Sequence, residues 1–114
     1  MRGGYEGEPR DGVYKGVGLE HTALITWSAS REAEGLPSVQ QFIQPAWLGE
    51  GGQEDEGWSL VCRFDDVPLD QGNPSTAFVR FLVADAPHEY LQPGAVLRLF
   101  DGDRDARATV RILD

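Results

Sequence analysis

Apolar and polar residues alternate in several segments from His21 onward, and such alternation is typical of half-buried β-strands. In HTALITWSA the expected inward face holds Ala23, Ile25 and Trp27. In WSLVCRFDD it holds Trp58, Leu60, Cys62 and Phe64, while the outward face holds Ser59, Val61, Arg63 and Asp65. In TAFVRFLVA one face holds Ala77, Val79, Phe81 and Val83, and the other holds Phe78, Arg80 and Leu82. These segments predict three strands.

Three further segments complete the expected set of strands. SVQQFIQPAWLG contains Pro45, which cannot donate a ladder hydrogen bond, so we expect an irregular strand at an edge or a bulge. AVLRLF and ARATVRIL are the expected fifth and sixth strands. No segment shows a convincing amphipathic helical pattern. The sequence therefore predicts an all-β fold, a small six-stranded antiparallel β-barrel, in which closure removes the edges that an open sheet would expose.

The expected barrel occupies residues 21–114. Small residues suit the crowded inward face of its last strand, where Ala106 and Ala108 lie. The large aromatic residues expected in the core are Trp27, Trp58, Phe64 and Phe81. Residues 1–20 contain six glycines and no sustained periodicity, so we expect a flexible Gly-rich arm with at most a short edge strand over residues 13–17.

Charge and cysteine content narrow the choice of partners and compartment. Ten Lys and Arg against nineteen Asp and Glu give a formal net charge of -9, a field that opposes phosphate backbones and favours basic proteins. Nucleic acid is therefore not an expected partner, whereas another protein is. Cys62 is the only cysteine, which fits a reducing, cytoplasmic location. No apolar run approaches the roughly 18 residues of a spanning helix, so we expect no membrane association.

The segment from Leu97 to Leu113, LRLFDGDRDARATVRIL, carries a family resemblance. It resembles the closing hairpin of the third domain of elongation factor Tu and its relatives, in which a Leu-Arg-aromatic strand precedes an acidic-Gly-x-Arg turn and a strand of small and β-branched residues. The matching positions are Leu97, Arg98, Asp101, Gly102, Arg104, Ala108, Val110 and Ile112. The order and approximate spacing of six strands from His21 onward also fit. The resemblance implies the barrel fold.

Two departures from this family limit what the resemblance implies. The last strand carries Ala106 and Ala108 where family members usually have glycine. The sequence also lacks the Gly-x-x-x-x-Gly-Lys-Ser/Thr phosphate loop of the family's GTPase domain, so GTP hydrolysis is excluded. The resemblance concerns the fold, so the family's contacts with transfer RNA and with its own GTPase domain are not assumed for this chain, and the acidic net charge counts against the first.

The segment DGDRD could be a calcium loop or a hairpin turn, because Asp101, Asp103 and Asp105 have the alternate spacing of calcium ligands. Such a loop needs glycine at its sixth position and glutamate at its twelfth, where this chain has Ala106 and Ile112. A tight turn explains the Asp-Gly pair directly, because both residues tolerate positive φ. We therefore expect a turn and no metal.

Other side-chain chemistry is sparse in the sequence. His21 and His88 lack partners at zinc-ligand spacing, and Cys62 alternates with core residues, which favours a buried, inert thiol. The acids Glu54, Asp55 and Glu56 lie in a Gly-rich run and are expected to be solvated. No catalytic signature is present, so we expect no enzyme, no cofactor and no catalytic residues.

Arginines on the outward registers of the expected strands are the candidate binding surface. They could form a stripe that docks an acidic partner, or simply a polar exterior balanced by nearby acids. They are Arg63, Arg80, Arg98, Arg107 and Arg111. Two functions fit the sequence. One is a stand-alone protein-binding barrel that resembles the translation-factor domain, and the other is a small acidic immunity or antitoxin protein that inhibits a basic toxin.

Overall fold

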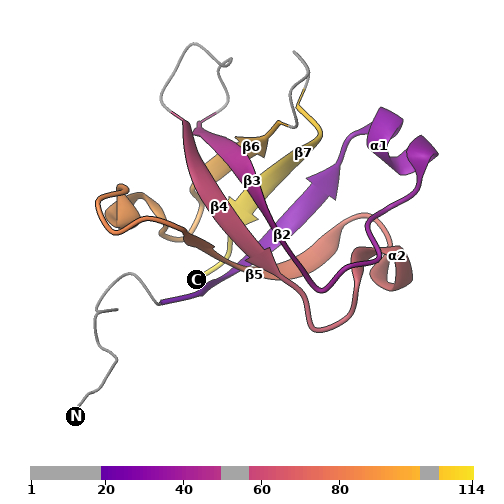
Figure 1. The fold of residues 1–114 in the computed structure, drawn as a ribbon, viewed down its shortest axis with the longest axis horizontal. Coiled ribbons are helices and arrows are strands. Elements are labelled where there is room, and N and C mark those ends of the chain that lie inside the picture. Colours follow the sequence, from indigo (N-terminus) through magenta and orange to yellow (C-terminus); the bar gives the residue numbers. More distant parts are fainter. Residues whose placement is uncertain (1–18, 50–56, 101–105) are drawn as a thin grey trace.

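The computed structural model describes residues 19–49, 57–100 and 106–114 of the chain, and it contains a closed antiparallel β-barrel of six strands (Figure 1). The order around the barrel is β2-β5-β4-β3-β6-β7. The bounds are β2 His21–Trp27, β3 Gln41–Leu48, β4 Gly57–Arg63, β5 Ser75–Phe81, β6 Val96–Leu99 and β7 Ala108–Ile112. The predicted all-β barrel is therefore confirmed.

Strand β2 closes the barrel, because it pairs with β5 on one side and with β7 on the other. Ala23 is opposite both Ala77 of β5 and Ile112 of β7. The remaining neighbours are also antiparallel, and β3 has the longest register, running from Gln41 opposite Arg63 to Trp47 opposite Gly57. Each strand thus has two neighbours, which satisfies the backbone groups that an open edge would expose.

The barrel interior is filled by the inward faces of the six strands, and the predicted alternation is largely confirmed. Three of the four predicted core aromatics are buried, namely Trp27, Phe64 and Phe81, and Trp58 is half-buried against the core. The fully enclosed strand residues include Ala23, Ile25, Ala46, Leu60, Cys62, Ala77, Val79, Leu97, Leu99 and Val110. Small alanines alternate with large side chains in this set, as the narrow interior of a small barrel requires.

One inward assignment is wrong, and one residue assigned to the outward face is buried. Val83 is 39% exposed, because β5 ends at Phe81 and the chain leaves the barrel wall before Val83. Val61 lies on the outward register but is only 2% exposed. Its cross-strand neighbours are Ile43 on β3 and Arg80 on β5, and long side chains on both sides can cover a β-branched residue between them.

Pro45 does not mark an edge strand, so that expectation is wrong. Strand β3 pairs with β4 and with β6. The N–H of Phe100 donates to the Pro45 carbonyl at 3.2 Å, and the nitrogen and carbonyl of one strand residue point to the same side. The Pro45 nitrogen, which carries no hydrogen, therefore faces the end of β6, just beyond the Ala46–Leu99 pair where the pairing of β3 with β6 stops.

The helical segments within the described residues are short and lie in the connections between strands. They are α1 Ala29–Glu34, α2 Pro68–Gln71 and the 3-10 turn η1 His88–Tyr90. Helix α1 directly follows β2, and the chain then continues through residues 35–40 into β3 (Figure 1). In the described part of the chain, no helix combines the length and apolar character needed to span a membrane.

Several sequence-based expectations fall outside the described residues. They are the flexible arm as far as residue 18, the solvated acidic run at residues 54–56 and the Asp101–Gly102 turn. The first described strand begins at His21, where the barrel domain was expected to begin.

Candidate binding pocket at one end of the barrel

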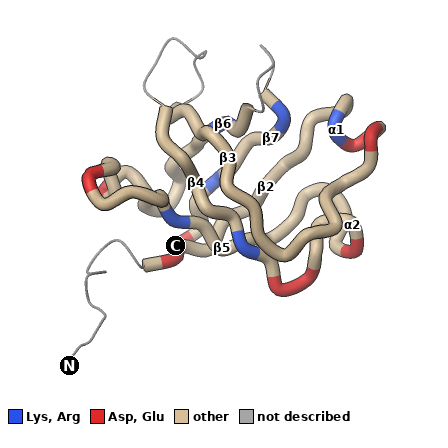
Figure 2. The backbone as a smooth tube through the Cα atoms, viewed as in Figure 1, with Lys and Arg blue, Asp and Glu red and all other residues tan. Residues whose placement is uncertain are grey.

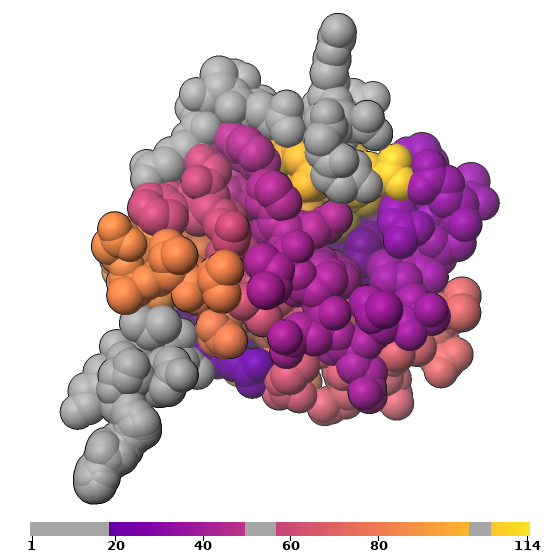
Figure 3. Space-filling model, in the orientation of Figure 1, coloured from indigo at the N-terminus to yellow at the C-terminus, as the bar shows by residue number. Residues whose placement is uncertain are grey.

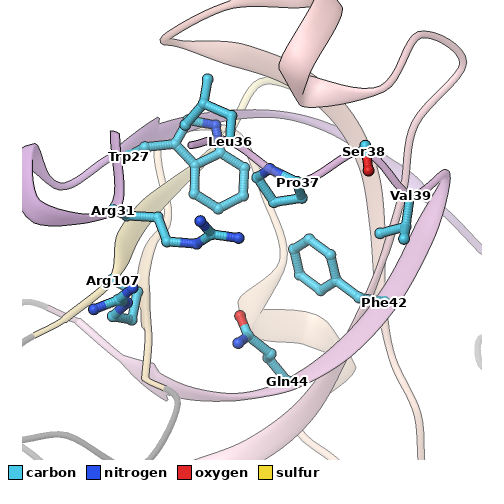
Figure 4. A pocket seen from close by; sticks show the side chains of 9 residues that line it. All are labelled: Trp27, Arg31, Leu36, Pro37, Ser38, Val39, Phe42, Gln44 and Arg107. Atoms are coloured by element: carbon cyan, nitrogen blue, oxygen red, sulfur yellow. The ribbon is translucent and has the colours of Figure 1, made fainter. Parts of the chain in front are cut away.

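A half-open pocket of about 450 Å³ lies at the end of the barrel where β2 passes into α1. In the space-filling view the face toward the reader is formed largely by the residues of α1, the segment after it and β3, in purple (Figure 3). The pocket is lined by Trp27, Arg31, Leu36, Pro37, Ser38, Val39, Phe42, Gln44 and Arg107 (Figure 4). This lining combines aromatic and aliphatic surface with two guanidinium groups.

Trp27, the last residue of β2, is fixed by hydrogen bonds at both its backbone and its ring. Its N–H donates to Asn73 Oδ1 at 2.9 Å, and Asn73 Nδ2 donates back to the Trp27 carbonyl at 3.1 Å. The indole Nε1 donates to Ser75 Oγ at 3.0 Å. The indole is therefore held in one orientation before any ligand arrives, which reduces the entropy cost of binding.

Strand β3 supplies the opposite wall of the pocket. Phe42 and Gln44 lie on its inward register, two residues apart, so both side chains point toward the pocket interior (Figure 4). The rings of Phe42 and Trp27 meet edge to face, with centroids 6.3 Å apart and planes at 65°. Phe42 also packs on Phe64, with centroids at 5.5 Å. The aromatic wall thus continues into the barrel core.

Arg31 enters the pocket from α1. The helix begins after Ser28, whose Oγ accepts the Arg31 N–H at 3.1 Å, and it ends at Gly35, whose φ of 105° favours glycine. The Arg31 side chain donates to the Gly35 carbonyl and extends into the pocket near the Trp27 and Phe42 rings (Figure 4). A helix of one and a half turns thus serves to place one guanidinium.

Arg107 comes from the segment just before β7. Its backbone carbonyl accepts the Ser28 N–H at 2.9 Å, and its side chain forms an ion pair with Glu34 of α1. The Arg107 side chain is 12% exposed, whereas that of Glu34 is 56% exposed. The two arginines of the pocket are therefore brought together through α1, although they lie far apart in sequence.

These groups suit the binding of an anion attached to an apolar body. A guanidinium binds a carboxylate with two parallel N–H donors, and such charge-assisted hydrogen bonds are about twice as strong as neutral ones. Trp27, Leu36, Pro37 and Phe42 supply apolar surface beside the two arginines. Pockets of this kind are mostly apolar with a few placed polar groups that fix the orientation of the ligand.

The five arginines predicted as a binding stripe are not brought together into one. Arg63 and Arg80 lie on β4 and β5, whereas Arg98 and Arg111 lie on β6 and β7, and β3 or β2 stands between the two pairs around the barrel (Figure 2). Of the five, Arg107 alone lines the pocket. A partner-binding role for the others remains a prediction.

Arg63 and Arg80 flank a carboxylate at the start of β2. Arg63 donates to both oxygens of Glu20 at 2.9 Å and also pairs with Asp65 at 3.2 Å, while its guanidinium lies 4.6 Å from the Phe78 ring centroid. The hydrogen bond from Arg63, helped by the nearby charges of Arg63 and Arg80, lowers the pKa of Glu20. The same pairing raises the pKa of Arg63. Arg63 is therefore paired with nearby acidic residues, as expected for a polar exterior whose charges are balanced.

Arg98 lies on the outward register but is buried, with 8% of its surface exposed. Its Nε donates to the Gly49 carbonyl at 2.6 Å, and its guanidinium lies 5.5 Å from the Phe100 ring centroid. Arg98 therefore ties β6 to the end of β3 rather than facing a partner. Arg111, by contrast, is exposed on β7.

Sequence reasoning missed Arg31, the central cation of the pocket. A signal was present, since Ser28 and Gly35 bracket the segment as a helix start and stop. Six residues are too few to show a hydrophobic period, so the helix was not expected.

The other candidate groups are in structural positions. Cys62 is fully enclosed, and burial raises the pKa of its thiol. His88 Nε2 lies 3.0 Å and 2.9 Å from the carbonyls of Val83 and Ala84, and His21 Nδ1 lies 3.0 Å from the Asp114 carbonyl. Within the residues that the structure describes, no group of three His, Cys, Asp or Glu side chains could hold a metal ion.

Comparison of the chain with protein-family models, curated proteins and solved structures finds no match. At the level of fold, the chain is a closed six-stranded antiparallel β-barrel, and no family or structural neighbour identifies it further.

Proposed function

We propose that this chain is a non-catalytic, cytoplasmic β-barrel module that binds another protein through the pocket between α1 and β3. The observation that carries the proposal is that Arg31 and Arg107 line the same pocket as Trp27 and Phe42. Aromatic and arginine side chains are the residues that contribute most to protein interfaces, especially where they surround a depression that a partner side chain can fill.

The structure of the pocket favours binding over a passive surface role. Trp27 is held by Asn73 and Ser75, and Arg31 is held by the capped helix α1. Ordering side chains at an interface costs about 0.5–1.5 kcal/mol each, so groups that are already ordered bind with less loss. The pocket residues offer donors, positive charge and apolar area in a fixed arrangement.

The pocket supports one of the two functions that the sequence left open. A basic toxin would need an acidic docking surface, whereas two arginines line this pocket. The acidic run at residues 50–56, which would serve an inhibitor, lies outside the described residues. The two arginines of the pocket thus favour the binding module. A relation to the third domain of elongation factor Tu is part of this proposal, supported by the six strands and by the closing hairpin sequence.

Site-specific photo-cross-linking tests the proposed function. A photoreactive amino acid replaces Val39, which lines the pocket and is 48% exposed, and in a matched control it replaces Leu69 on α2, which is 56% exposed and does not line it. In the cells that make the protein, we expect one defined protein adduct at position 39 and none at position 69. The adduct should be lost with Arg31→Ala and retained with Arg111→Ala. The same adducts at both positions, or none at either, would overturn the proposal.

A further inference from the structure

We propose that the pocket recognises the free carboxyl terminus of a partner chain whose last side chain is large and apolar. This inference rests on the proposed function, because it specifies which part of the partner enters the pocket. The geometry that points to it is that Arg31, Arg107, an aromatic wall and an amide side chain line one space of about 450 Å³, into which the Arg31 guanidinium extends (Figure 4).

The charge of the pocket suits one carboxylate. Arg31 and Arg107 supply two positive charges, and Glu34, paired with Arg107, offsets one of them. A singly charged carboxylate balances what remains, and it matches the two parallel donors of a guanidinium. A phosphate group, with nearly two negative charges at neutral pH, would face both the nearby Glu34 carboxylate and the strongly acidic chain.

The apolar wall suits a large side chain close to that carboxylate. Trp27, Leu36, Pro37 and Phe42 face the space into which Arg31 extends. In a C-terminal residue, the carboxylate and the side chain are attached to the same Cα, so both fit a pocket in which cation and aromatic rings are adjacent. An aspartate or glutamate side chain brings a carboxylate but no apolar group, and it would leave the Trp27 and Phe42 walls without contact.

Gln44 and Ser38 favour a peptide over a simple organic acid. Both residues line the pocket, and the Gln44 side chain extends into it from strand β3 (Figure 4). An amide side chain offers one acceptor and two donors, and a hydroxyl offers both roles, which match the N–H and C=O of a peptide backbone. A fatty acid would bring neither group, so burial would leave these polar side chains poorly paired.

The test uses fluorescein-labelled pentapeptides of the form Gly-Ser-Gly-Ser-X with the full-length protein, measured by fluorescence anisotropy. X is Phe, Leu or Ala, and each peptide is made as the free acid and as the C-terminal amide. We expect the free acids ending in Phe or Leu to bind at least about tenfold more tightly than their amides and than the Ala peptide, which is a difference that one charge-assisted contact can supply.

Variants separate the pocket from general charge attraction. Arg31→Gln should abolish the preference for the free acid, whereas Arg111→Gln, which removes an exposed arginine outside the pocket, should leave it unchanged. Equal binding of acid and amide, or tighter binding of the amidated peptide Gly-Ser-Gly-Ser-Phe with a phosphate on its second Ser, would overturn the inference. If the adduct at position 39 still forms in that case, the binding function stands and only the choice of ligand group is wrong.

Discussion

The backbone N–H of Ser28 donates to the carbonyl oxygen of Arg107 at 2.9 Å, while the hydroxyl of the same serine accepts the N–H of Arg31 at 3.1 Å. One residue thus joins the end of β2, the start of α1 and the segment that leads into β7. Both pocket arginines are therefore connected through Ser28.

We expect Ser28→Ala to lower the free energy of unfolding by about 1 kcal/mol, because the hydroxyl that caps α1 is lost. The same change should weaken binding of the free-acid peptides, since Arg31 is then held less firmly. Urea denaturation and fluorescence anisotropy measure the two effects. Ser28→Asn supplies another good capping group and should restore both; an Ala variant that matches the parent in both assays would contradict the positioning role.

Two of the predicted stripe arginines should differ sharply when removed. Arg98→Ala deletes a buried donor to the Gly49 carbonyl, so we expect a loss of about 1–3 kcal/mol in the free energy of unfolding. Arg111→Ala removes an exposed side chain and should change stability by less than about 0.5 kcal/mol. Thermal and chemical denaturation measure both. Equal effects of the two substitutions would show that burial does not distinguish these residues.

The Glu20–Arg63 pair should make stability depend on pH in the acidic range. Arg63 lowers the pKa of Glu20 below its ordinary value of 4.5, so the folded state binds this proton less readily than the unfolded state. The stabilisation is complete above the ordinary pKa and is lost as the pH falls through the lowered one. Between about pH 6 and pH 3, Glu20→Gln should therefore lose less stability than the parent.

Denaturation curves at a series of pH values check this expectation. Glu89→Gln, at an exposed position on η1, controls for the removal of one negative charge. If the Glu20 and Glu89 variants follow the same pH profile as each other, the ion pair does not contribute.

The Cys62 thiol should resist modification until the barrel opens. It is fully enclosed, and its raised pKa keeps it protonated at neutral pH, whereas the thiolate is the reactive form. We expect a water-soluble aromatic disulfide reagent to react at least about a hundredfold more slowly with the native protein than with the protein in urea. Cys62→Ala should abolish the reaction in both conditions. Fast reaction of the native protein would mean that this side of the barrel opens readily.

The alternation of apolar and polar residues predicted the inward faces of the strands well where the barrel interior was the only place in which an apolar side chain could be buried. Ala23, Ile25 and Val79 follow the pattern because every second residue of a barrel strand points inward. The same rule placed Arg98 outward correctly but could not show that it is buried. Its burial depends on neighbours supplied by other segments, namely Trp47, which lies opposite it on β3, and the carbonyl of Gly49.

The order of strands and the pocket were beyond the reach of sequence pattern. Periodicity shows which face of a strand is apolar, not which strand lies beside it, so the placing of β5 between β2 and β4 could not be deduced. The pocket depends on that order, since Trp27, Phe42 and Arg107 come from separate segments. Arg107 was singled out for its outward register, and its role emerges only beside Arg31.

The pairing of β2 with β7, which sets Ala23 opposite Ile112, has a kinetic consequence. Contacts between residues so far apart in the sequence require the closure of a very long loop, and barrels dominated by such contacts fold in roughly milliseconds to seconds, far more slowly than helical bundles. Hairpins such as β3–β4 can form early, but Trp27 and Arg107 line one pocket only after β2 and β7 have paired. During refolding, binding of the free-acid peptides is therefore expected only in the final kinetic phase. Peptide binding would then measure the closure of the barrel.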